Sequence, residues 1–276
     1  MSRQFIYHLA DRIQRTLARS SAAVRVAVLM RNQARCVIKY YLAESPNVEE
    51  TGEAWVLGLV APDARRIVDV GANVGDWLAG ALACANAQVA AIACEPSSSA
   101  HALLCKRFDN DARVSVSDAA LGDFVGTMAF LEEPNAGRGS TLVPGLGRIE
   151  GSVHTVPVTT LAALFERAGW GDADMVKIDA EGFDARVIRG GEALVREQRI
   201  GVVQFEYNRA WQIAEETLRG TYRRFEEAGY RVFLLKRDGL YDLDYARYEE
   251  YFEYSNFIAI APAWMPRFVP YLRGRI

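Results

Sequence analysis

Short apolar runs of strand length alternate with amphipathic segments of helix length along most of this chain. The run at residues 67–70 ends at Gly71, and residues 78–85 then carry apolar side chains at the i, i+3, i+4 and i+7 spacing of a helix that packs against a sheet. Residues 88–94 form the next apolar run, and Ser97 is a natural N-cap for the helix after it. This alternation predicts an α/β fold with a doubly wound parallel sheet.

Later apolar runs continue the sheet, with one interruption. Further strands are predicted at 113–117, 127–131, 175–178 and 202–208, and a further helix at 218–226. Between Glu132 and Ser152 lie five glycines and two prolines. A loop of this length and composition is typical of a lid or a substrate contact, or of plain disorder. His154, just beyond it, is interpreted as structural rather than catalytic.

Composition indicates an ordinary globular protein. Half of the 276 residues are hydrophobic and 24% are charged, which suits one α/β domain with an appendage. The four cysteines form no C-x-x-C pair and do not cluster with the three histidines. Neither a zinc site nor a disulfide framework is therefore indicated, and a cytoplasmic location fits best. The apolar patch at 22–30 contains Arg25, is too short to span a bilayer and precedes no cleavage signal.

Charge is distributed unevenly along the chain. Residues 1–40 hold seven arginines and one lysine against a single acid, about +7, in a chain whose net charge is −3, so the remainder carries about −10. The acidic body disfavours a nucleic-acid substrate. The N-terminal segment is predicted to be a basic helical arm. It is interpreted as a solvated helix packed on the catalytic domain or, alternatively, as a segment attracted to anionic lipid headgroups or an acidic substrate, with the aromatic and basic C-terminal tail joining it.

The turn after the first strand carries the most informative motif. Its pattern is acidic-x-Gly-x-x-x-Gly, with Asp69 two residues before Gly71 and with Gly75 closing the turn. A dinucleotide fingerprint beginning at Gly71 would need glycines where this chain has Asn73 and Asp76. Because glycine lets backbone N–H groups approach a ligand closely, the turn is predicted to hold a ligand at the N-terminus of the following helix.

Acids recur at the carboxyl ends of later strands, where open α/β sheets bind their ligands. Glu95 ends the second strand and is followed by Pro96, a position that offers a bidentate acceptor to ribose hydroxyls in NAD-binding and SAM-binding proteins alike. In the fourth strand, the two-residue period puts Lys177 and Asp179 on one face, and Glu181 completes an ionisable cluster. Charges there are costly to bury without a purpose.

Four blocks together resemble the FkbM family of S-adenosylmethionine (SAM) dependent methyltransferases. They are VDVGANVG at the glycine turn, EP at Glu95 and Pro96, VKIDAEGFD, and VVQFEYN at 202–208. The resemblance, which extends over about residues 47–260, implies a Rossmann-like class I methyltransferase fold with a seven-stranded, mostly parallel sheet and helices on both faces. It also implies O-methylation of hydroxyl groups on sugars, glycans, glycolipids or polyketides. Two positions depart from the family pattern, with Asp184 for glutamate and Ala162 for aspartate, and Asn73 stands where motif I of class I methyltransferases has its middle glycine.

The resemblance further implies roles for individual residues in holding SAM. The glycine turn holds the methionine end, the Asp69 position receives the ammonium group, Glu95 meets the ribose and Asp118 meets the adenine amino group. The predicted cofactor-binding residues are Asp69, Gly71, Asn73, Gly75, Glu95, Pro96 and Asp118.

An alcohol must lose its proton during methyl transfer, and its high pKa calls for a positioned carboxylate or a metal. The predicted catalytic residues are Lys177, Asp179, Glu181 and Glu206. Asp179, with Glu206 and Asn208 on the neighbouring strand, resembles the acid and amide ligands of magnesium-dependent O-methyltransferases, which makes Mg²⁺ a hypothesis. The residues do not decide which carboxylate is the general base.

The sequence therefore predicts a basic helical arm at 1–46, a SAM-dependent methyltransferase domain at 47–262 and a basic aromatic tail at 263–276. The expected partner is a hydroxylated small molecule, a glycan or a lipid-linked acceptor, in the cytoplasm or at the inner membrane face. Two alternatives stay open. One is a nucleotide-dependent oxidoreductase, and the other is a SAM-binding protein without catalysis, or an adaptor that uses the arm on a lipid surface.

Overall fold

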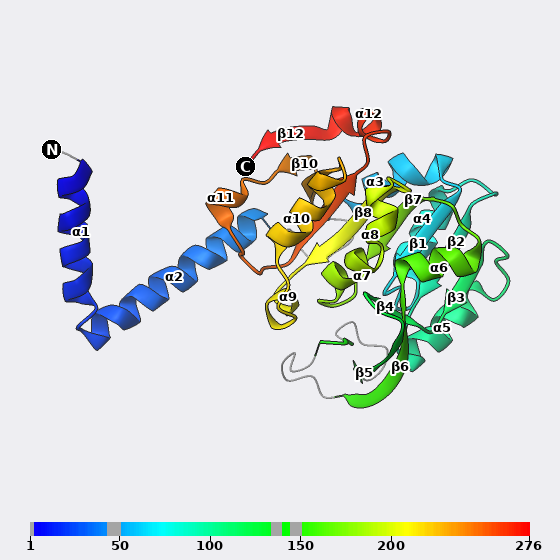
Figure 1. Ribbon diagram of the computed structural model, residues 1–276, viewed down its shortest axis with the longest axis horizontal. Coiled ribbons are helices and arrows are strands. Elements are labelled where there is room, and N and C mark those ends of the chain that lie inside the picture. Colours follow the sequence, from blue (N-terminus) through cyan, green and yellow to red (C-terminus); the bar gives the residue numbers. More distant parts are fainter. Residues whose placement is uncertain (1–2, 43–50, 134–139, 144–150) are drawn as a thin grey trace. The chain divides into compact units, whose positions relative to one another are not determined.

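A computed structural model describes residues 3–42, 51–133, 140–143 and 151–276 (Figure 1). Its contacts divide the chain into two compact units, Met1–Leu42 and Ala43–Ile276. The first unit consists of helices α1 (Arg3–Leu17) and α2 (Ser21–Leu42), and the Ser20 hydroxyl between them accepts a hydrogen bond from the Ala23 N–H as the N-cap of α2. Among the described residues, no helix is long and apolar enough to cross a membrane.

The second unit is built on a nine-stranded sheet in the order β12-β10-β9-β11-β8-β7-β1-β2-β3. Parallel pairing joins β3, β2, β1, β7 and β8, and antiparallel pairing joins β8 to β11, β11 to β9 and β9 to β10. Their bounds are β1 (Arg66–Val70), β2 (Ala90–Cys94), β3 (Val114–Ser117), β7 (Ala173–Ile178), β8 (Ile200–Tyr207), β9 (Arg231–Lys236), β10 (Gly239–Asp242), β11 (Ser255–Ile260) and β12 (Leu272–Arg275).

The predicted α/β sheet is confirmed, with two strands more than the predicted seven. The additional strands are β10, which forms a hairpin with β9, and β12, which pairs in parallel with β10 at the edge of the sheet. The C-terminal segment, expected as a separate tail, thus contributes the outermost strand. β12 has a sequence of LRGR and is mostly exposed, so no apolar run marks it.

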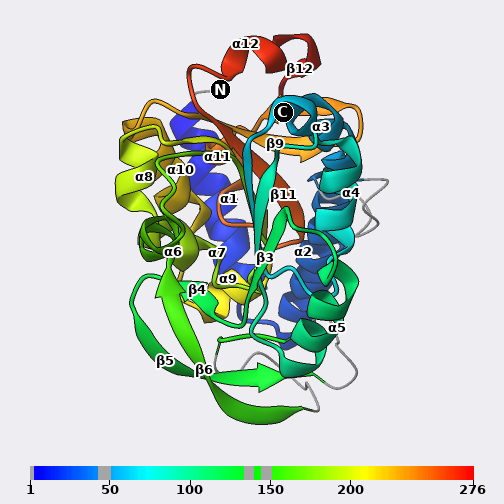
Figure 2. The ribbon, with the colours of Figure 1, turned by 90° about the vertical axis from the view of Figure 1, so that its right-hand side faces the viewer.

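Helices cover both faces of the sheet. Figure 2 shows α3, α4 and α5 on one side and α6, α8 and α10 on the other. Central strands β1 and β7 are buried almost throughout, as strands covered on both faces must be. The helices of this unit are α3 (Glu53–Val60), α4 (Asp76–Cys84), α5 (Ser98–Phe108), α6 (Leu161–Ala168), α7 (Asp184–Gly190), α8 (Glu192–Arg196), α9 (Ala210–Ile213), α10 (Leu218–Glu227), α11 (Tyr245–Tyr248) and α12 (Met265–Phe268).

A second, three-stranded sheet contains the hairpin expected around residues 127–131. It has the order β4-β6-β5, formed by β4 (Ala120–Gly122), β5 (Gly126–Glu132) and β6 (Ser152–Thr160). In the glycine-rich loop between β5 and β6, the structure describes Glu133, residues 140–143 and Gly151, so most of the predicted lid lies outside the described residues. Within the described part, the Thr141 N–H and C=O bond to Leu131, and the Thr141 hydroxyl donates to the Glu181 carbonyl at 2.8 Å.

Glu132 ties this hairpin to the N-terminus of α5. Its carboxylate accepts hydrogen bonds from the Ser99 N–H and from the hydroxyls of Ser97, Ser98 and Ser99, at 2.7–3.2 Å. His154 Nε2 lies 3.4 Å from the same carboxylate. Burial raises the pKa of Glu132, but these hydrogen bonds outweigh burial and lower the pKa from 4.5 to about 2. The negatively charged Glu132, at the end of β5, therefore also interacts favourably with the positive N-terminal end of the α5 helix dipole.

We expect Glu132→Gln to lower the free energy of unfolding by about 1–3 kcal/mol at neutral pH, because hydrogen bonds to a charged acceptor are lost. A carboxyl whose folded-state pKa is depressed stabilises the protein above its unfolded pKa of 4.5 and loses that contribution as the pH falls toward 2. Urea unfolding should therefore show a difference in the free energy of unfolding between wild type and variant that becomes smaller as the pH falls from 6 to 3. The matched control is Glu166→Gln, at an exposed glutamate. If both variants lose the same unfolding free energy, the stabilising role of the Glu132 carboxylate is contradicted.

Candidate active site

The glycine turn connects β1 to α4 with two left-handed residues, Gly71 at φ 73° and Gly75 at φ 83°. A Cβ on Gly71 would lie 1.9 Å from the Asp179 carbonyl oxygen, and one on Gly75 would lie 2.6 Å from the Phe108 ring. This packing is a reason for glycine that the sequence did not reveal, and the expected approach of a ligand to the turn stays a prediction. Glycine is required because the turn packs tightly against the protein itself.

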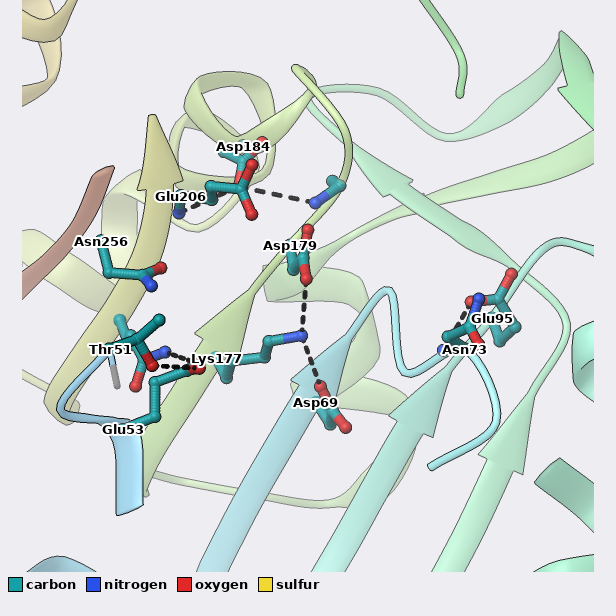
Figure 3. A network of polar contacts seen from close by, with 12 residues as sticks. Thr51, Glu53, Asp69, Asn73, Glu95, Lys177, Asp179, Asp184, Glu206 and Asn256 are labelled. Carbon is teal, nitrogen blue, oxygen red and sulfur yellow. Dashed lines mark hydrogen bonds and ion pairs between the residues drawn. The ribbon is translucent and has the colours of Figure 1, made fainter. Parts of the chain in front are cut away.

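Asn73 and Glu95 fix the shape of this turn. Asn73 adopts φ 47°, a left-handed conformation that asparagine tolerates better than most residues, which explains its presence at a position of glycine in related motifs. The Glu95 carboxylate accepts hydrogen bonds from the Asn73 N–H at 2.8 Å and from the Ser97 N–H at 2.7 Å (Figure 3). Burial raises the pKa of Glu95 to about 7, although both N–H donors oppose the shift.

A cavity of about 460 Å³ opens at the carboxyl ends of β1, β2, β7 and β8, which is within the range of small-molecule sites. Eight of the predicted site residues line it, namely Gly71, Asn73, Glu95, Pro96, Lys177, Asp179, Glu181 and Glu206. The structure thus brings together both halves of the predicted site, the glycine turn and the carboxylates of β7 and β8.

Three predicted cofactor-binding residues do not line this cavity. Asp69 is completely buried, because it lies within β1 rather than after it. Gly75 is covered by Leu104 and Phe108 of α5. Asp118 is exposed, while the next residue, Ala119, contributes to the wall. The roles given to these three residues stay predictions.

Lys177 joins two acids across adjacent strands. Asp69 on β1 and Lys177 on β7 are register partners, and Lys177 Nζ lies 3.6 Å from Asp69 Oδ1 and 3.1 Å from Asp179 Oδ2 (Figure 3). Burial lowers the pKa of Lys177, but Asp179 and Asp69 outweigh it and hold the pKa above its ordinary value. Burial raises the pKa of Asp69 to about 6 even against the attraction of Lys177, since neither Asp69 oxygen accepts a hydrogen bond from the described residues.

Asp184 shapes the loop that carries Asp179 and Glu181. It is fully buried, and its carboxylate accepts hydrogen bonds from the N–H groups of Ala180, Gly182 and Glu206. Burial and the nearby Asp179 raise the pKa of Asp184 to about 7. The shorter side chain at this family position therefore still bridges the ends of β7 and β8.

Glu181 and Glu206 share the carboxylate end of the cavity with Asp179. Burial first, and then the neighbouring carboxylates, raise the pKa of both glutamates above the ordinary value. Glu181 stands in a left-handed conformation at φ 48°, and Glu206 accepts a hydrogen bond from the Asn208 amide at 2.5 Å. Because the three acids face one space, ionisation of one makes ionisation of its neighbours less favourable.

The family of this chain follows from its sequence. The methyltransferase FkbM domain matches residues 69–232, more than half of the 276-residue chain. The chain belongs to the FkbM methyltransferase family. The predicted resemblance is confirmed, and with it membership of the SAM-dependent methyltransferases.

Solved structures similar to this FkbM-family protein include methyltransferases of several kinds and spermidine synthases. They include the O-methyltransferase TomG from Streptomyces achromogenes (15% identity, 80% of this chain and 82% of that chain, TM-score 0.41) and an O-methyltransferase from Bacillus cereus (12%, 85% and 89%, 0.41). Precorrin-6y C5,15-methyltransferase from Geobacter metallireducens is another (12%, 76% and 87%, 0.41). Similarity this distant says nothing about the acceptor. A search of curated proteins found no match.

Sequence reasoning missed several residues that line the cavity of this FkbM-family protein, among them Glu53, Thr141, Tyr254 and Asn256. Buried Glu53 begins α3, and its carboxylate accepts hydrogen bonds from the Gln204 amide and the Thr51 hydroxyl. Asn256 is the register partner of Glu206 and donates to the Tyr254 hydroxyl at 3.2 Å. An acid at the start of an apolar helix was a readable signal for Glu53, but its place beside β8 is set by tertiary packing.

The magnesium hypothesis receives no support from the geometry. Across residues 3–42, 51–133, 140–143 and 151–276, no group of three or more His, Cys, Asp or Glu side chains is placed to hold a metal ion. Glu206 and Asn208 bond to each other, and Asp179 pairs with Lys177. The donors therefore do not form a ligand set, and the function proposed below uses no metal.

Proposed function

We propose that this protein transfers a methyl group from SAM to a hydroxyl group of a sugar, glycan, glycolipid or polyketide-type acceptor. The observation that carries the proposal is one cavity lined on one side by the glycine turn with Glu95, and on the other by Asp179, Glu181 and Glu206. A nucleoside site and a proton-accepting site thus adjoin each other.

The first side of the cavity fits the cofactor. A carboxylate offers about four acceptor positions, and Glu95 uses two of them for the Asn73 and Ser97 N–H groups, which leaves acceptors for ribose hydroxyls. Leu121 and Phe130 supply apolar wall on the same cavity for a base. When bound, SAM supplies an electrophilic methyl group on a positively charged sulfur.

The second side fits an alcohol. Asp179 lies one residue beyond the end of β7 and forms an ion pair with Lys177, so we assign it as the carboxylate that accepts the hydroxyl proton. Burial and the nearby Asp179 raise the pKa of Glu206, so this glutamate holds a proton more readily than an ordinary carboxyl, and in its protonated form it donates a hydrogen bond that orients the acceptor oxygen. Lys177 positions Asp179 rather than touching the acceptor.

The two alternative functions receive different support from the sequence and the structure. A nucleotide-dependent oxidoreductase loses support, because the chain belongs to a methyltransferase family and lacks glycine at positions 73 and 76. A SAM-binding protein without catalysis would bind the cofactor on the same side of the cavity. It would differ from the proposed enzyme only in that no alcohol is methylated beside Asp179. Transfer activity separates the two.

Mass spectrometry on candidate acceptors tests the proposal. The protein would be incubated with deuterium-labelled SAM and with panels of sugars, glycans, glycolipids and polyketides. We expect one class to gain the mass of a labelled methyl group that a base-stable ether retains. Label found only in base-labile esters or on nitrogen would contradict O-methylation of a hydroxyl, and binding of SAM without any transfer would favour the non-catalytic alternative.

A further inference from the structure

The first unit of the chain is two helices, each with an apolar side and a basic side. In α2, the residues Val26, Met30 and Val37 recur at i, i+4 and i+11 and are 55%, 68% and 70% exposed. In α1, Ile13 and Leu17 are likewise about half exposed. Within this unit, no described residue covers these apolar side chains.

Three basic residues occupy the other side of α2, which they share with the partly exposed Val24 and Val28. Arg31, Arg35 and Lys39 follow one another at i, i+4 and i+8 along α2, on the side opposite Met30 and Val37. Seven arginines and one lysine stand against the single Asp11 in residues 1–42. The unit is thus strongly cationic, although the whole chain carries a net charge of −3.

We infer that these two helices bind the surface of an anionic lipid bilayer, with their apolar sides in the interface between headgroups and acyl chains. Large amphipathicity, basic residues on the polar side and modest overall hydrophobicity are the features of helices that lie in that interface. The 22 residues of α2 extend over about 33 Å at 1.5 Å per residue, so a helix lying flat would present several basic residues to the headgroups at once. Tyr40, 82% exposed near its end, suits the same boundary.

Charge complementarity selects the lipid surface over other occupants. A second copy of this unit would be repelled, because each copy carries a net charge of about +7. Anionic headgroups instead attract each basic residue by about 1 kcal/mol. A nucleic acid would account for the basic side but leave Val26, Met30 and Val37 in water. This inference is independent of the methyl transfer proposed above.

Vesicle co-sedimentation of the full chain tests the inference. We expect binding to phosphatidylcholine vesicles that contain phosphatidylglycerol, weakening with added salt, and little binding to phosphatidylcholine alone. The triple variant R31Q/R35Q/K39Q should bind about 100-fold more weakly, at about a factor of five for each charge. The apolar variant V26N/M30N/V37N should also lose binding.

The matched control is R196Q/R223Q/R247Q, which removes three exposed charges from the second unit and should bind like wild type. Circular dichroism of each variant checks that the helices form. Three results would overturn the inference. The first is no binding of wild type to anionic vesicles, and the second is loss of binding in the charge variant alone, which would show that the apolar side does not enter the interface. The third is a dimer in light scattering that V26N/M30N/V37N abolishes, which would assign a second copy.

Discussion

Replacing Asp179 with Asn is expected to lower kcat for methyl transfer by about 10²–10⁴-fold, the usual contribution of a positioned general base. Asparagine keeps the size of the side chain and a hydrogen-bonding oxygen but cannot take the proton from the acceptor hydroxyl. Because Asp179 lies on the far side of the cavity from Glu95 in the proposed arrangement, the affinity for S-adenosylhomocysteine should change by less than about 3-fold. Steady-state kinetics on the acceptor found by mass spectrometry, with calorimetry for the cofactor product, measures both.

The control for this variant is Asp172→Asn, a half-exposed carboxylate that pairs with Arg66 at the other end of the sheet. It should retain wild-type kcat. If Asp179→Asn keeps kcat within about 10-fold of wild type, the proton acceptor is another group, and Glu206→Gln becomes the decisive variant. If kcat and cofactor affinity fall together, Asp179 acts on the shape of the site instead.

Replacing Lys177 with Met is expected to lower the free energy of unfolding by about 3–5 kcal/mol, the cost of leaving a buried charge without its partner. Asp69 is fully buried, its oxygens accept no hydrogen bond from the described residues, and Lys177 is its counter-charge. Without Lys177 the pKa of Asp69 rises beyond its present value of about 6. An acid whose pKa is raised in the folded state destabilises the fold as the pH rises above the pKa of the unfolded state, which is 3.8 for Asp69. The loss of unfolding free energy in Lys177→Met should therefore be larger at pH 8 than at pH 5.

The double variant Asp69→Asn/Lys177→Met distinguishes this explanation from simple damage to packing. With both buried charges removed, most of the lost stability should return, and a double-mutant cycle should show a coupling of about 1–3 kcal/mol. Urea unfolding of the four proteins gives the cycle. Equal destabilisation in the single and double variants would show that Lys177 matters for its volume rather than for its charge.

The position of each acid relative to the end of its strand explains how much of the site could be predicted. Glu95 and Asp179 each lie one residue beyond a strand, after Cys94 and Ile178, and both line the cavity. Asp69 lies one residue before the end of β1 and is buried. The predicted apolar runs end at the same residues as these three strands, but motif spacing does not show whether an acid inside a strand faces the cavity or the core.

Other parts of the site depend on contacts that no local pattern encodes. Asn256 faces Glu206 because β11 returns antiparallel beside β8, and Glu53 reaches Gln204 across 151 positions of sequence. The edge strand β12 escaped prediction for a related reason, since an exposed edge needs no apolar face. The glycines of the turn were found by their spacing, yet their reason, close packing against Asp179 and Phe108, appears only in three dimensions.

Calorimetric titration of S-adenosylhomocysteine into the wild-type protein and into Glu95→Gln tests the central claim, that the cavity beside the glycine turn holds the nucleoside. We expect one molecule bound per wild-type chain, no binding of NAD, and affinity about 10–100-fold weaker in Glu95→Gln, because a hydrogen bond to a charged acceptor is lost. Unfolding of Glu95→Gln near the wild-type temperature would show that the turn itself is intact. Binding that is absent from the wild type, or equal in both proteins, would contradict the account.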